Sequence, residues 1–352
     1  MVVPTRPVPP SPDAIADRIL AGEDHALDTA GLLALLQPEV DVWPLMNAAD
    51  RVRRGRFGNR IHLCSIVNAK EGGCPEDCGF CSQSRHVSTH VAPSKFTPIE
   101  TIVNESSKAR SRRATALGLV TATRGLDDGN KGLDHIVDAV RAVRDAGHTE
   151  AHASLGFLSE AALDRLIDAG LTELNHNLES GRSFFSKIVT THTYDERIET
   201  IKRAKDKGLR TCVGGIFGMG EGPSDRVELA ETLRELDVDE VPINFLVGIE
   251  GTRLAKADPL PPLEMLRIIA AYRLFLPRQN IFIAAGRNHL GQLMPLMFSA
   301  GASGIMIGDF LTTPNRGVED DLRMIDELGL ETFGCDTGQP RPEMVRRLPV
   351  VA

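Results

Sequence analysis

The sequence predicts an α/β fold, a (β/α)8 TIM-type barrel that follows a helical N-terminal extension. From about residue 58 onward, short runs rich in β-branched and aliphatic residues alternate with longer amphipathic segments, and this alternation repeats eight times. Cysteines and unusual polar residues cluster directly after several of the predicted strands. A parallel barrel places its catalytic groups there, so the motif positions agree with the predicted architecture.

The predicted strands are separated by segments that are long enough for one helix each. Strands are expected at residues 62–67, 115–123, 151–156, 171–177, 209–217, 241–247, 281–285 and 303–307. Helices are expected at residues 97–112, 131–146, 159–169, 194–207, 224–236, 262–276, 290–300 and 319–328. Local signals support several boundaries: Ser11 and Pro12 begin an N-terminal helix, residues 97–100 have the pattern of a capping box, and Gly170 ends a helix.

Neither a linker nor an internal repeat divides the 352 residues. We therefore expect three parts: a flexible leader and helical extension at residues 1–57, one catalytic barrel at residues 58–333, and a C-terminal tail at residues 334–352. The first twelve residues contain five prolines and lack the apolar stretch of a secretory signal. No apolar run approaches the roughly 18 residues that a membrane-spanning helix needs.

The composition is typical of a soluble globular protein, with 42% hydrophobic and 25% charged residues. A net charge of −8, without a basic stripe, argues against a nucleic-acid partner. The one dense basic run, at residues 51–56, is explained by a solvated or locally anchored face. Unpaired thiols predict a reducing compartment, the cytoplasm.

Three of the six cysteines, Cys74, Cys78 and Cys81, lie within eight residues in the spacing C-x3-C-x2-C. Thiolates bind soft metals, and the neighbouring Gly and Pro residues allow the loop to wrap closely around a metal centre. A structural zinc site usually has four protein ligands, whereas an iron–sulfur cubane held by three cysteines leaves one iron open to another ligand. The three thiols therefore predict an iron–sulfur cluster.

Two other interpretations of this loop remain open. A zinc site would need a fourth ligand from His62, His86 or His90, although zinc loops usually pair their ligands in C-x2-C or Cys/His blocks. A disulfide framework is less favoured because three clustered thiols cannot pair evenly.

The spacing, with Phe80 directly before the last cysteine, resembles the signature of the radical S-adenosylmethionine (SAM) superfamily. The longer pattern of Asn68-Ala69-Lys70, Cys74-Pro75-Glu76-Asp77-Cys78 and Cys81-Ser82-Gln83-Ser84 resembles the biotin synthase family in particular. The resemblance extends over about residues 53–331. It implies that the cysteines hold a [4Fe-4S] cluster, whose fourth iron chelates SAM and whose electron cleaves SAM to methionine and a 5′-deoxyadenosyl radical.

The resemblance also implies binding residues on later strands. Asn177 and Asn244 correspond to positions that bind the ureido ring of dethiobiotin, and Asn175 shares a face with Asn177. Glu179 corresponds to a carboxylate at the SAM ribose, usually Asp in the family, and Arg197 to an arginine that contacts SAM. Turn chemistry at a strand end, or a surface ion pair for Arg197, would explain the same residues without a ligand.

Glycines at the end of the fifth predicted strand suggest a close approach of the backbone to a nucleoside. Gly214 and Gly215 do not belong to a G-x-G-x-x-G pattern, so a dinucleotide fingerprint is a poor interpretation. A plain strand-to-helix turn is the alternative.

A second, auxiliary [2Fe-2S] cluster is implied by the resemblance, with Cys212 and Arg287 at two of its four ligand positions. The other two positions hold Gly118 and His152, so two expected thiolates are missing. Imidazole can ligate an iron–sulfur cluster, but glycine cannot. We hypothesise a remodelled site of Cys64, His152, Cys212 and Arg287; alternatively, the two cysteines are small core residues.

The function predicted from this resemblance is insertion of sulfur into dethiobiotin to form biotin, by a radical SAM enzyme. It implies a reductant such as flavodoxin or ferredoxin and a homodimer. One alternative is a radical SAM relative without sulfur insertion, of the maturase or methylornithine-synthase kind, which the missing thiolates favour. A non-enzymatic iron–sulfur carrier or sensor is the other.

Overall fold

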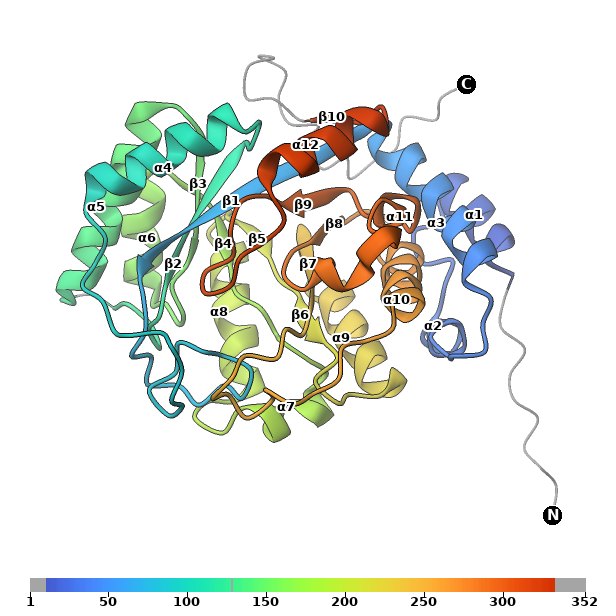
Figure 1. Cartoon of the computed structure of the whole chain (residues 1–352), viewed down its shortest axis with the longest axis horizontal. Coiled ribbons are helices and arrows are strands. Elements are labelled where there is room, and N and C mark those ends of the chain that lie inside the picture. Colours follow the sequence, from blue (N-terminus) through green and yellow to red (C-terminus); the bar gives the residue numbers. More distant parts are fainter. Residues whose placement is uncertain (1–10, 128, 333–352) are drawn as a thin grey trace.

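Parallel strands form the centre of the molecule in the computed structural model, which describes residues 11–127 and 129–332 (Figure 1). The strands are β1 (Arg60–Lys70), β2 (Ala116–Thr121), β3 (Glu150–Ser154), β4 (Leu171–Asn175), β5 (Arg210–Cys212), β6 (Gly215–Phe217), β7 (Glu240–Phe245), β8 (Asn280–Ile283), β9 (Gly304–Met306) and β10 (Glu331–Thr332). Pairing proceeds around the sheet from β1 to β9, and β9 pairs back with β1. The sheet is therefore closed, which confirms the predicted barrel.

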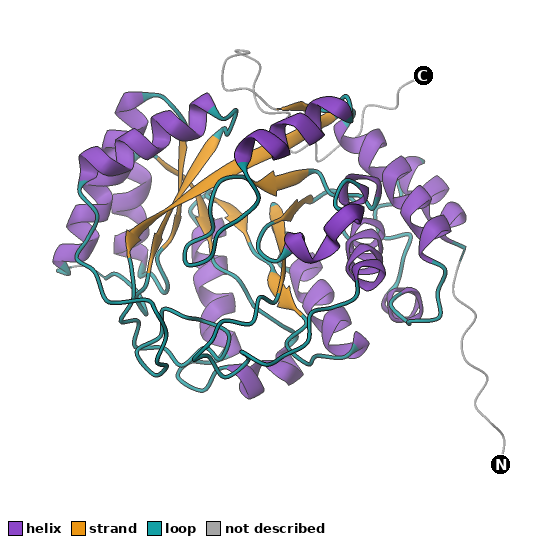
Figure 2. Ribbon diagram, viewed as in Figure 1, coloured by secondary structure: helices purple, strands orange, loops and turns teal. Residues whose placement is uncertain are grey.

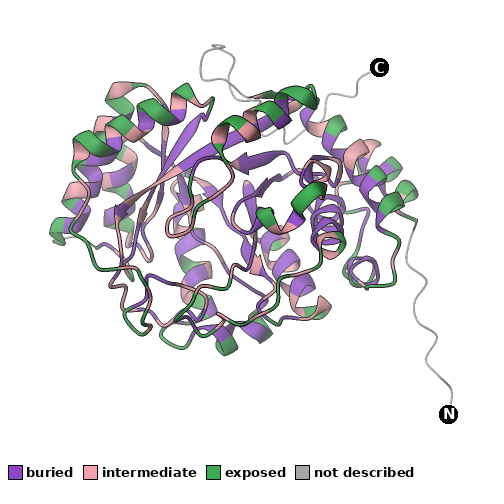
Figure 3. Ribbon diagram, viewed as in Figure 1, coloured by how far each residue is buried: buried purple, intermediate pink, exposed green. Residues whose placement is uncertain are grey.

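Helices follow the strands and cover the outside of the barrel (Figure 2). They are α4 (Ile99–Ser111), α5 (Lys131–Ala146), α6 (Glu160–Ala169), α7 (Arg182–Ile188), α8 (Tyr194–Asp206), α9 (Pro223–Glu235), α10 (Pro262–Phe275), η1 (Arg287–Leu293), α11 (Leu296–Ser299) and α12 (Val318–Glu327). Their apolar faces point inward and their polar faces outward (Figure 3), as expected for amphipathic helices on a sheet.

The predicted N-terminal extension consists of α1 (Pro12–Leu20), α2 (Thr29–Leu35) and α3 (Val42–Phe57). Ser11 is the N-cap of α1 and Pro12 its first residue, as the sequence predicts. Helix α3 packs against α10, so residues 265–275 of α10 are buried on every side. The leader at residues 1–10 and the tail at residues 334–352 lie outside the described residues.

Some boundaries differ from the prediction for identifiable reasons. The fifth predicted strand is two short strands, β5 and β6, because the chain approaches β7 so closely at Gly214 that a Cβ there would lie 1.9 Å from the Pro242 carbonyl oxygen. Thr97 is not an N-cap: its hydroxyl donates to the Asn68 carbonyl oxygen at 2.7 Å, and Pro98 takes the cap position. In place of the predicted helix at 290–300 the structure has η1, which is kinked at Gly291 (φ +52°), and the short helix α11.

Two elements were not predicted. Helix α7 lies in the loop after β4, and β10 pairs in parallel with the first residues of β1, outside the closed barrel. Among the described residues, the structure contains no helix long and apolar enough to cross a membrane.

Candidate active site at the carboxyl ends of the strands

A cavity of about 420 Å³ opens at the carboxyl ends of the barrel strands. Its walls include all three loop cysteines together with most of the predicted binding residues: Phe80, Asn175, Asn177, Glu179, Arg197 and Asn244. The barrel thus brings these residues from four separate stretches of the chain into one pocket. Gly214 and Gly215 do not line it.

The cysteine loop follows β1 and is closed by backbone hydrogen bonds. The Cys74 amide donates to the Gln83 carbonyl oxygen at 3.0 Å, and the Arg85 amide donates to the Cys74 carbonyl oxygen at 2.8 Å. The Gly79 amide ties the middle of the loop to Ile188 at the end of α7. These backbone hydrogen bonds hold the loop in a defined conformation that does not require a bound metal.

Burial raises the pKa of each loop thiol, to about 11 for Cys81 and further for Cys78. The thiols are consequently protonated in the free protein, and a bound cation would convert them to thiolates. At neighbouring Asp77, hydrogen bonds from Thr190 and Thr191 outweigh burial and lower the pKa to about 2.

The positions of the three sulfur atoms favour a cluster over a single zinc ion. Tetrahedral zinc with bonds of about 2.3 Å needs its sulfur ligands about 3.8 Å apart. Within the part of the chain that the structure describes, the only trio of His, Cys or acidic side chains with ligand atoms all within 4.8 Å is elsewhere, in the barrel interior. The loop thiols are therefore too widely spaced for one zinc ion, whereas a cubane places each sulfur on a different iron.

The histidines suggested as a fourth zinc ligand are also engaged elsewhere. His86 Nε2 lies 2.8 Å from the Pro75 carbonyl oxygen, and His90 Nε2 lies 3.2 Å from the Thr312 carbonyl oxygen. His62 lies inside the barrel beside Glu240. The residues of the loop fit a three-cysteine [4Fe-4S] cluster and do not fit a zinc knuckle.

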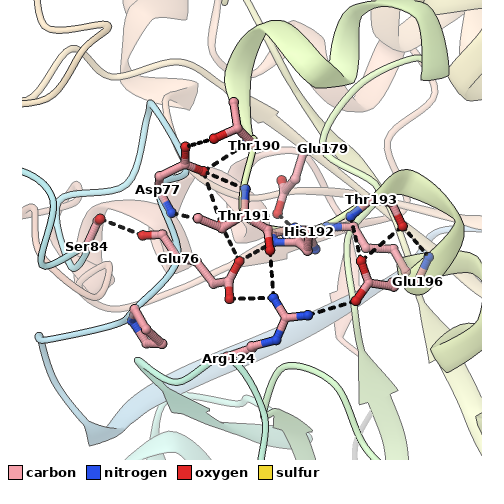
Figure 4. Close-up of polar contacts among 12 residues, drawn as sticks. Glu76, Asp77, Ser84, Arg124, Glu179, Thr190, Thr191, His192, Thr193 and Glu196 are labelled. Atoms are coloured by element: carbon pink, nitrogen blue, oxygen red, sulfur yellow. Dashed lines mark hydrogen bonds and ion pairs between the residues drawn. The ribbon is translucent and has the colours of Figure 1, made fainter.

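A buried chain of polar contacts joins the cysteine loop to Arg197, and Figure 4 shows the part of it from Glu76 to His192. Glu76, between Cys74 and Cys78, contacts His192 Nδ1 and also accepts a hydrogen bond from Arg124 at 2.8 Å. On the opposite side of the ring, Arg197 Nε donates to His192 Nε2 at 2.9 Å. His192 is therefore neutral, carries its proton on Nδ1, and connects the loop to the arginine.

The pKa shift of His192 agrees with its assignment as a neutral ring. Burial and the Arg197 charge lower the pKa of His192 despite the opposing effect of Glu76, so the ring can accept from the guanidinium. The sequence motifs assign no role to Glu76 or His192. The one feature of the sequence that points to them is the carboxylate of Glu76 between two cysteine ligands, which would need a polar partner if it were buried.

Arg197 and Glu179 face each other across the pocket wall. Arg197 Nη1 donates to the Asn177 carbonyl oxygen at 2.6 Å and lies 3.7 Å from Glu179 Oε1. Glu179 is buried with φ +69°, and burial raises its pKa although Arg197 opposes the shift. Its Oε2 atom has no hydrogen-bond partner. Glu179 lines the pocket, and a carboxylate with one oxygen left without a donor fits a ligand with hydroxyl groups.

The two glycines approach their own chain. A Cβ on Gly215 would lie 2.7 Å from the Glu179 carbonyl oxygen, and the Gly214 amide donates to Asn177 Oδ1 at 3.1 Å. In this structure these glycines position Asn177 and Glu179, so the predicted close approach is to residues 177–179 of the chain itself.

The remaining two asparagines, Asn244 and Asn175, differ in their hydrogen bonds. Asn244 donates to the Gly215 carbonyl oxygen and accepts from the Ala285 amide, at 3.2 and 3.1 Å. The buried Oδ1 atom of Asn175 has no partner. Asn175 lines the pocket, and its buried oxygen is an acceptor that the protein itself leaves unused.

The proposed auxiliary ligands are only partly brought together. Cys64 and His152 are in contact inside the barrel, and Cys212 is close to both Cys64 and Glu173. Burial would lower the pKa of His152, but Glu173 and its other neighbours outweigh burial and raise it well above its ordinary value. The imidazole is then a cation rather than a metal ligand.

Arg287 is directed elsewhere. It forms a two-pronged ion pair with Asp321 of α12, and both side chains are 0% exposed. Its other polar contacts in the described residues are with Met294 and Met306. The structure does not join Arg287 to Cys64, His152 and Cys212, contrary to the remodelled site suggested by the sequence.

A closed parallel barrel with a three-cysteine loop after its first strand defines a radical SAM protein. The model of the Radical SAM superfamily matches residues 72–233, and that of the Biotin and Thiamin Synthesis associated domain matches residues 242–331. The fold is similar to that of methylornithine synthase (TM-score 0.78, 20% identity, 91% of this chain and 97% of that one). It is also similar to the [FeFe]-hydrogenase maturase of Carboxydothermus hydrogenoformans (TM-score 0.77, 15% identity, 93% and 80%).

Sequence similarity specifies the family. The chain is 44% identical to the biotin synthase of Trichlorobacter lovleyi over 331 residues, which cover 94% of this chain and 98% of that protein. It is 44% identical to the biotin synthase of Geobacter sulfurreducens over 326 residues, covering 92% and 98%. The chain belongs to the biotin synthase family, as the resemblance of its motifs predicts.

Proposed function

We propose that this protein converts dethiobiotin to biotin by radical SAM chemistry. Full-length similarity to biotin synthases supports the reaction, and the pocket supports its location. The observation that carries the proposal is that one cavity is lined by the three loop cysteines together with Glu179 and Asn175, each of which has a buried oxygen without a hydrogen-bond partner.

The [4Fe-4S] cluster on Cys74, Cys78 and Cys81 would supply one electron and an open iron site for SAM. Glu179 would accept hydrogen bonds from the ribose hydroxyls. Arg197, held by His192, would carry a positive charge toward the SAM carboxylate. The protein's contribution is to bind both reactants in a fixed orientation and keep water away from the radical.

Asn175, Asn177 and Asn244 are the side chains that we assign to dethiobiotin. An amide group offers both a donor and an acceptor, and a ureido ring presents one carbonyl and two N–H groups. Asn175 is the best placed, because its buried oxygen lacks a donor within the protein. Phe80 contributes an apolar surface next to the cluster loop.

A direct test is product analysis with anaerobically reconstituted protein. SAM, dethiobiotin, sulfide and a low-potential reductant such as flavodoxin should give methionine, 5′-deoxyadenosine and biotin, measured by mass spectrometry. The Cys78→Ala protein, which lacks one cluster ligand, should give none of them. Deoxyadenosine without biotin from the native protein would refute the proposed reaction.

Formation of 5′-deoxyadenosine without biotin would support a radical SAM relative that abstracts hydrogen without inserting sulfur. One observation favours this alternative: Gly118 and His152 occupy positions where auxiliary thiolates are expected. A homodimer, a reductant of the flavodoxin or ferredoxin class and the division at residues 58 and 333 remain proposals from the family resemblance.

A further inference from the structure

A buried polar layer lies directly below the proposed dethiobiotin pocket. Glu173 and Glu240 each come two residues before a pocket residue, Asn175 and Pro242, so they point to the same side of the sheet one layer deeper. Cys212 on β5 is paired with Asn175 on one side and with Glu240 on the other. We refer to Glu173, Cys212 and Glu240 as the inner site.

The three side chains of the inner site converge. One carboxylate oxygen from each glutamate and the Cys212 sulfur all lie within 4.8 Å of one another. Glu173 is 0% exposed, and Cys212 and Glu240 are buried as well. Two carboxylates and a thiol so close together inside a barrel are costly unless positive charge lies beside or between them.

Each carboxylate of the inner site is held in place by neighbouring polar side chains. Arg210 Nε donates to Glu173 Oε2 at 3.4 Å, while Asn280 Nδ2 donates to Glu240 Oε1 at 3.0 Å. His62 Nδ1 also lies 3.0 Å from Glu240 Oε1. Carboxylate ligands of metal ions are typically held by such outer hydrogen bonds, which fix their direction.

One oxygen of the inner site lacks a donor. Glu173 Oε1 lies 2.9 Å from His152 Nδ1, but the two atoms are not aligned as a hydrogen bond, and Oε1 has no hydrogen-bond partner. The cationic His152 ring already compensates the charge of this oxygen. A metal ion would add the directed contact that the imidazole does not make.

The same layer does not fit the auxiliary [2Fe-2S] cluster that the family resemblance implies. Gly118 has no side chain to offer, and a Cβ there would lie 3.1 Å from Ile66 Cγ2. Both ring nitrogens of His152 face carboxylates, Glu173 and Glu150. Arg287 is paired with Asp321. Of the four family positions, only Cys212 presents a ligand atom to the layer.

We propose that the inner site binds one divalent metal ion of borderline character, such as Zn²⁺ or Fe²⁺, in place of an auxiliary iron–sulfur cluster. Mixed carboxylate and thiolate donors suit such ions, with bonds of about 2.0–2.3 Å. Bound donors would be about 3.3–3.8 Å apart, so the observed trio needs only a small contraction. Three protein donors leave a fourth position open.

The test separates the inner site from the radical SAM cluster. The full-length Cys74→Ala/Cys78→Ala/Cys81→Ala protein is treated anaerobically with iron and sulfide, and bound iron and acid-labile sulfide are counted. It is then stripped of metal and titrated with Co²⁺, whose thiolate charge-transfer absorption reports a cobalt–sulfur bond. We expect background sulfide and one Co²⁺ per chain.

Matched variants identify the donors. In that background, Cys212→Ser should abolish the charge-transfer band, and Glu173→Gln should weaken Co²⁺ binding at least tenfold. Cys64→Ser, which changes the other buried thiol of the layer, should leave both signals unchanged. Circular dichroism checks that each protein is folded. If the triple variant is unfolded, iron and sulfide are counted on the native protein, where four sulfides and five irons per chain are expected, the fifth iron being the one in the inner site.

Three kinds of result would overturn the proposal. The first is an additional iron–sulfur cluster, seen as sulfide-containing iron in the triple variant or as more than four sulfides in the native protein. The second is the lack of a saturable Co²⁺ site, and the third is a charge-transfer band that survives Cys212→Ser or is lost in Cys64→Ser. None of these measurements depends on biotin formation, so they are separate from the test of the proposed reaction.

Discussion

The buried ion pair between Arg287 and Asp321 gives a prediction whose size follows from the structure. Replacing Asp321 with Asn keeps the shape of the side chain but removes its charge. Arg287 would then carry a positive charge at a position that is 0% exposed, where its further acceptors among the described residues are the Met294 sulfur and the Met306 carbonyl oxygen. The folded state should lose stability because this guanidinium cannot reach water.

Breaking one side of a buried pair typically costs 3–5 kcal/mol, since the remaining charge stays uncompensated. Because every 1.4 kcal/mol is a factor of ten, we expect the unfolding equilibrium constant of the Asp321→Asn protein to rise roughly 10²- to 10⁴-fold. Removing both charges, in Arg287→Met/Asp321→Asn, should recover a substantial part of the loss because no unpaired ion remains.

Urea unfolding followed by circular dichroism measures these differences. The control is Asp326→Asn, which removes the partner of Arg113 in a two-pronged pair of similar geometry on the surface, with 43% and 54% of the side chains exposed. Exposed pairs contribute little, so the midpoint should not change. If Asp321→Asn is no more destabilising than Asp326→Asn, the assignment of Arg287 as the charge partner of Asp321 is wrong.

Three further predictions concern the pocket. His192→Phe removes the acceptor that holds Arg197, so the KM for SAM should rise about tenfold while cluster iron per chain stays constant; an unchanged KM would contradict this positioning role. Asn175→Ala should raise the KM for dethiobiotin about tenfold and leave that for SAM unaffected, and an equal change in both would refute the assignment. Burial and the charge of Arg197 lower the pKa of His176 well below its ordinary value, so below about pH 6.5 only the unfolded state gains this proton. Stability from this residue should then fall by about 1.4 kcal/mol per pH unit, and His176→Gln should show a correspondingly shallower decline in urea unfolding between pH 6.5 and 5.5.

The barrel could be predicted from the sequence because its signals are local and repeated. Alternating β-like and amphipathic segments specify strand and helix order, and a cap such as Ser11 before Pro12 fixes a boundary. The break between β5 and β6 could not be predicted in this way. It depends on how closely Gly214 approaches Pro242, a residue that lies far along the chain.

The part of the site that could be predicted is the part encoded in the spacing of neighbouring residues. The interval between Cys74, Cys78 and Cys81 indicates a shared metal centre, and the pocket contains all three. The connection from Glu76 through His192 to Arg197 was not predictable, since each contact joins residues that only the fold brings together.

The interior layer shows the same limit. The family resemblance implies missing thiolates at Gly118 and His152, and the sequence suggests Cys64 as compensation. The structure instead places Glu173 and Glu240 beside Cys212, in addition to Cys64, and no local pattern connects these glutamates to a metal. Long-range pairing of β4, β5 and β7 creates this group of side chains.

The central claim, that the three-cysteine loop and the asparagine-lined pocket act together on dethiobiotin, is tested most directly by isotope transfer. Reconstituted protein is given SAM and fully deuterated dethiobiotin, and the 5′-deoxyadenosine product is analysed by mass spectrometry. We predict that deuterium appears in 5′-deoxyadenosine and that biotin accumulates. Unlabelled 5′-deoxyadenosine, formed at the same rate with or without dethiobiotin, would contradict the account.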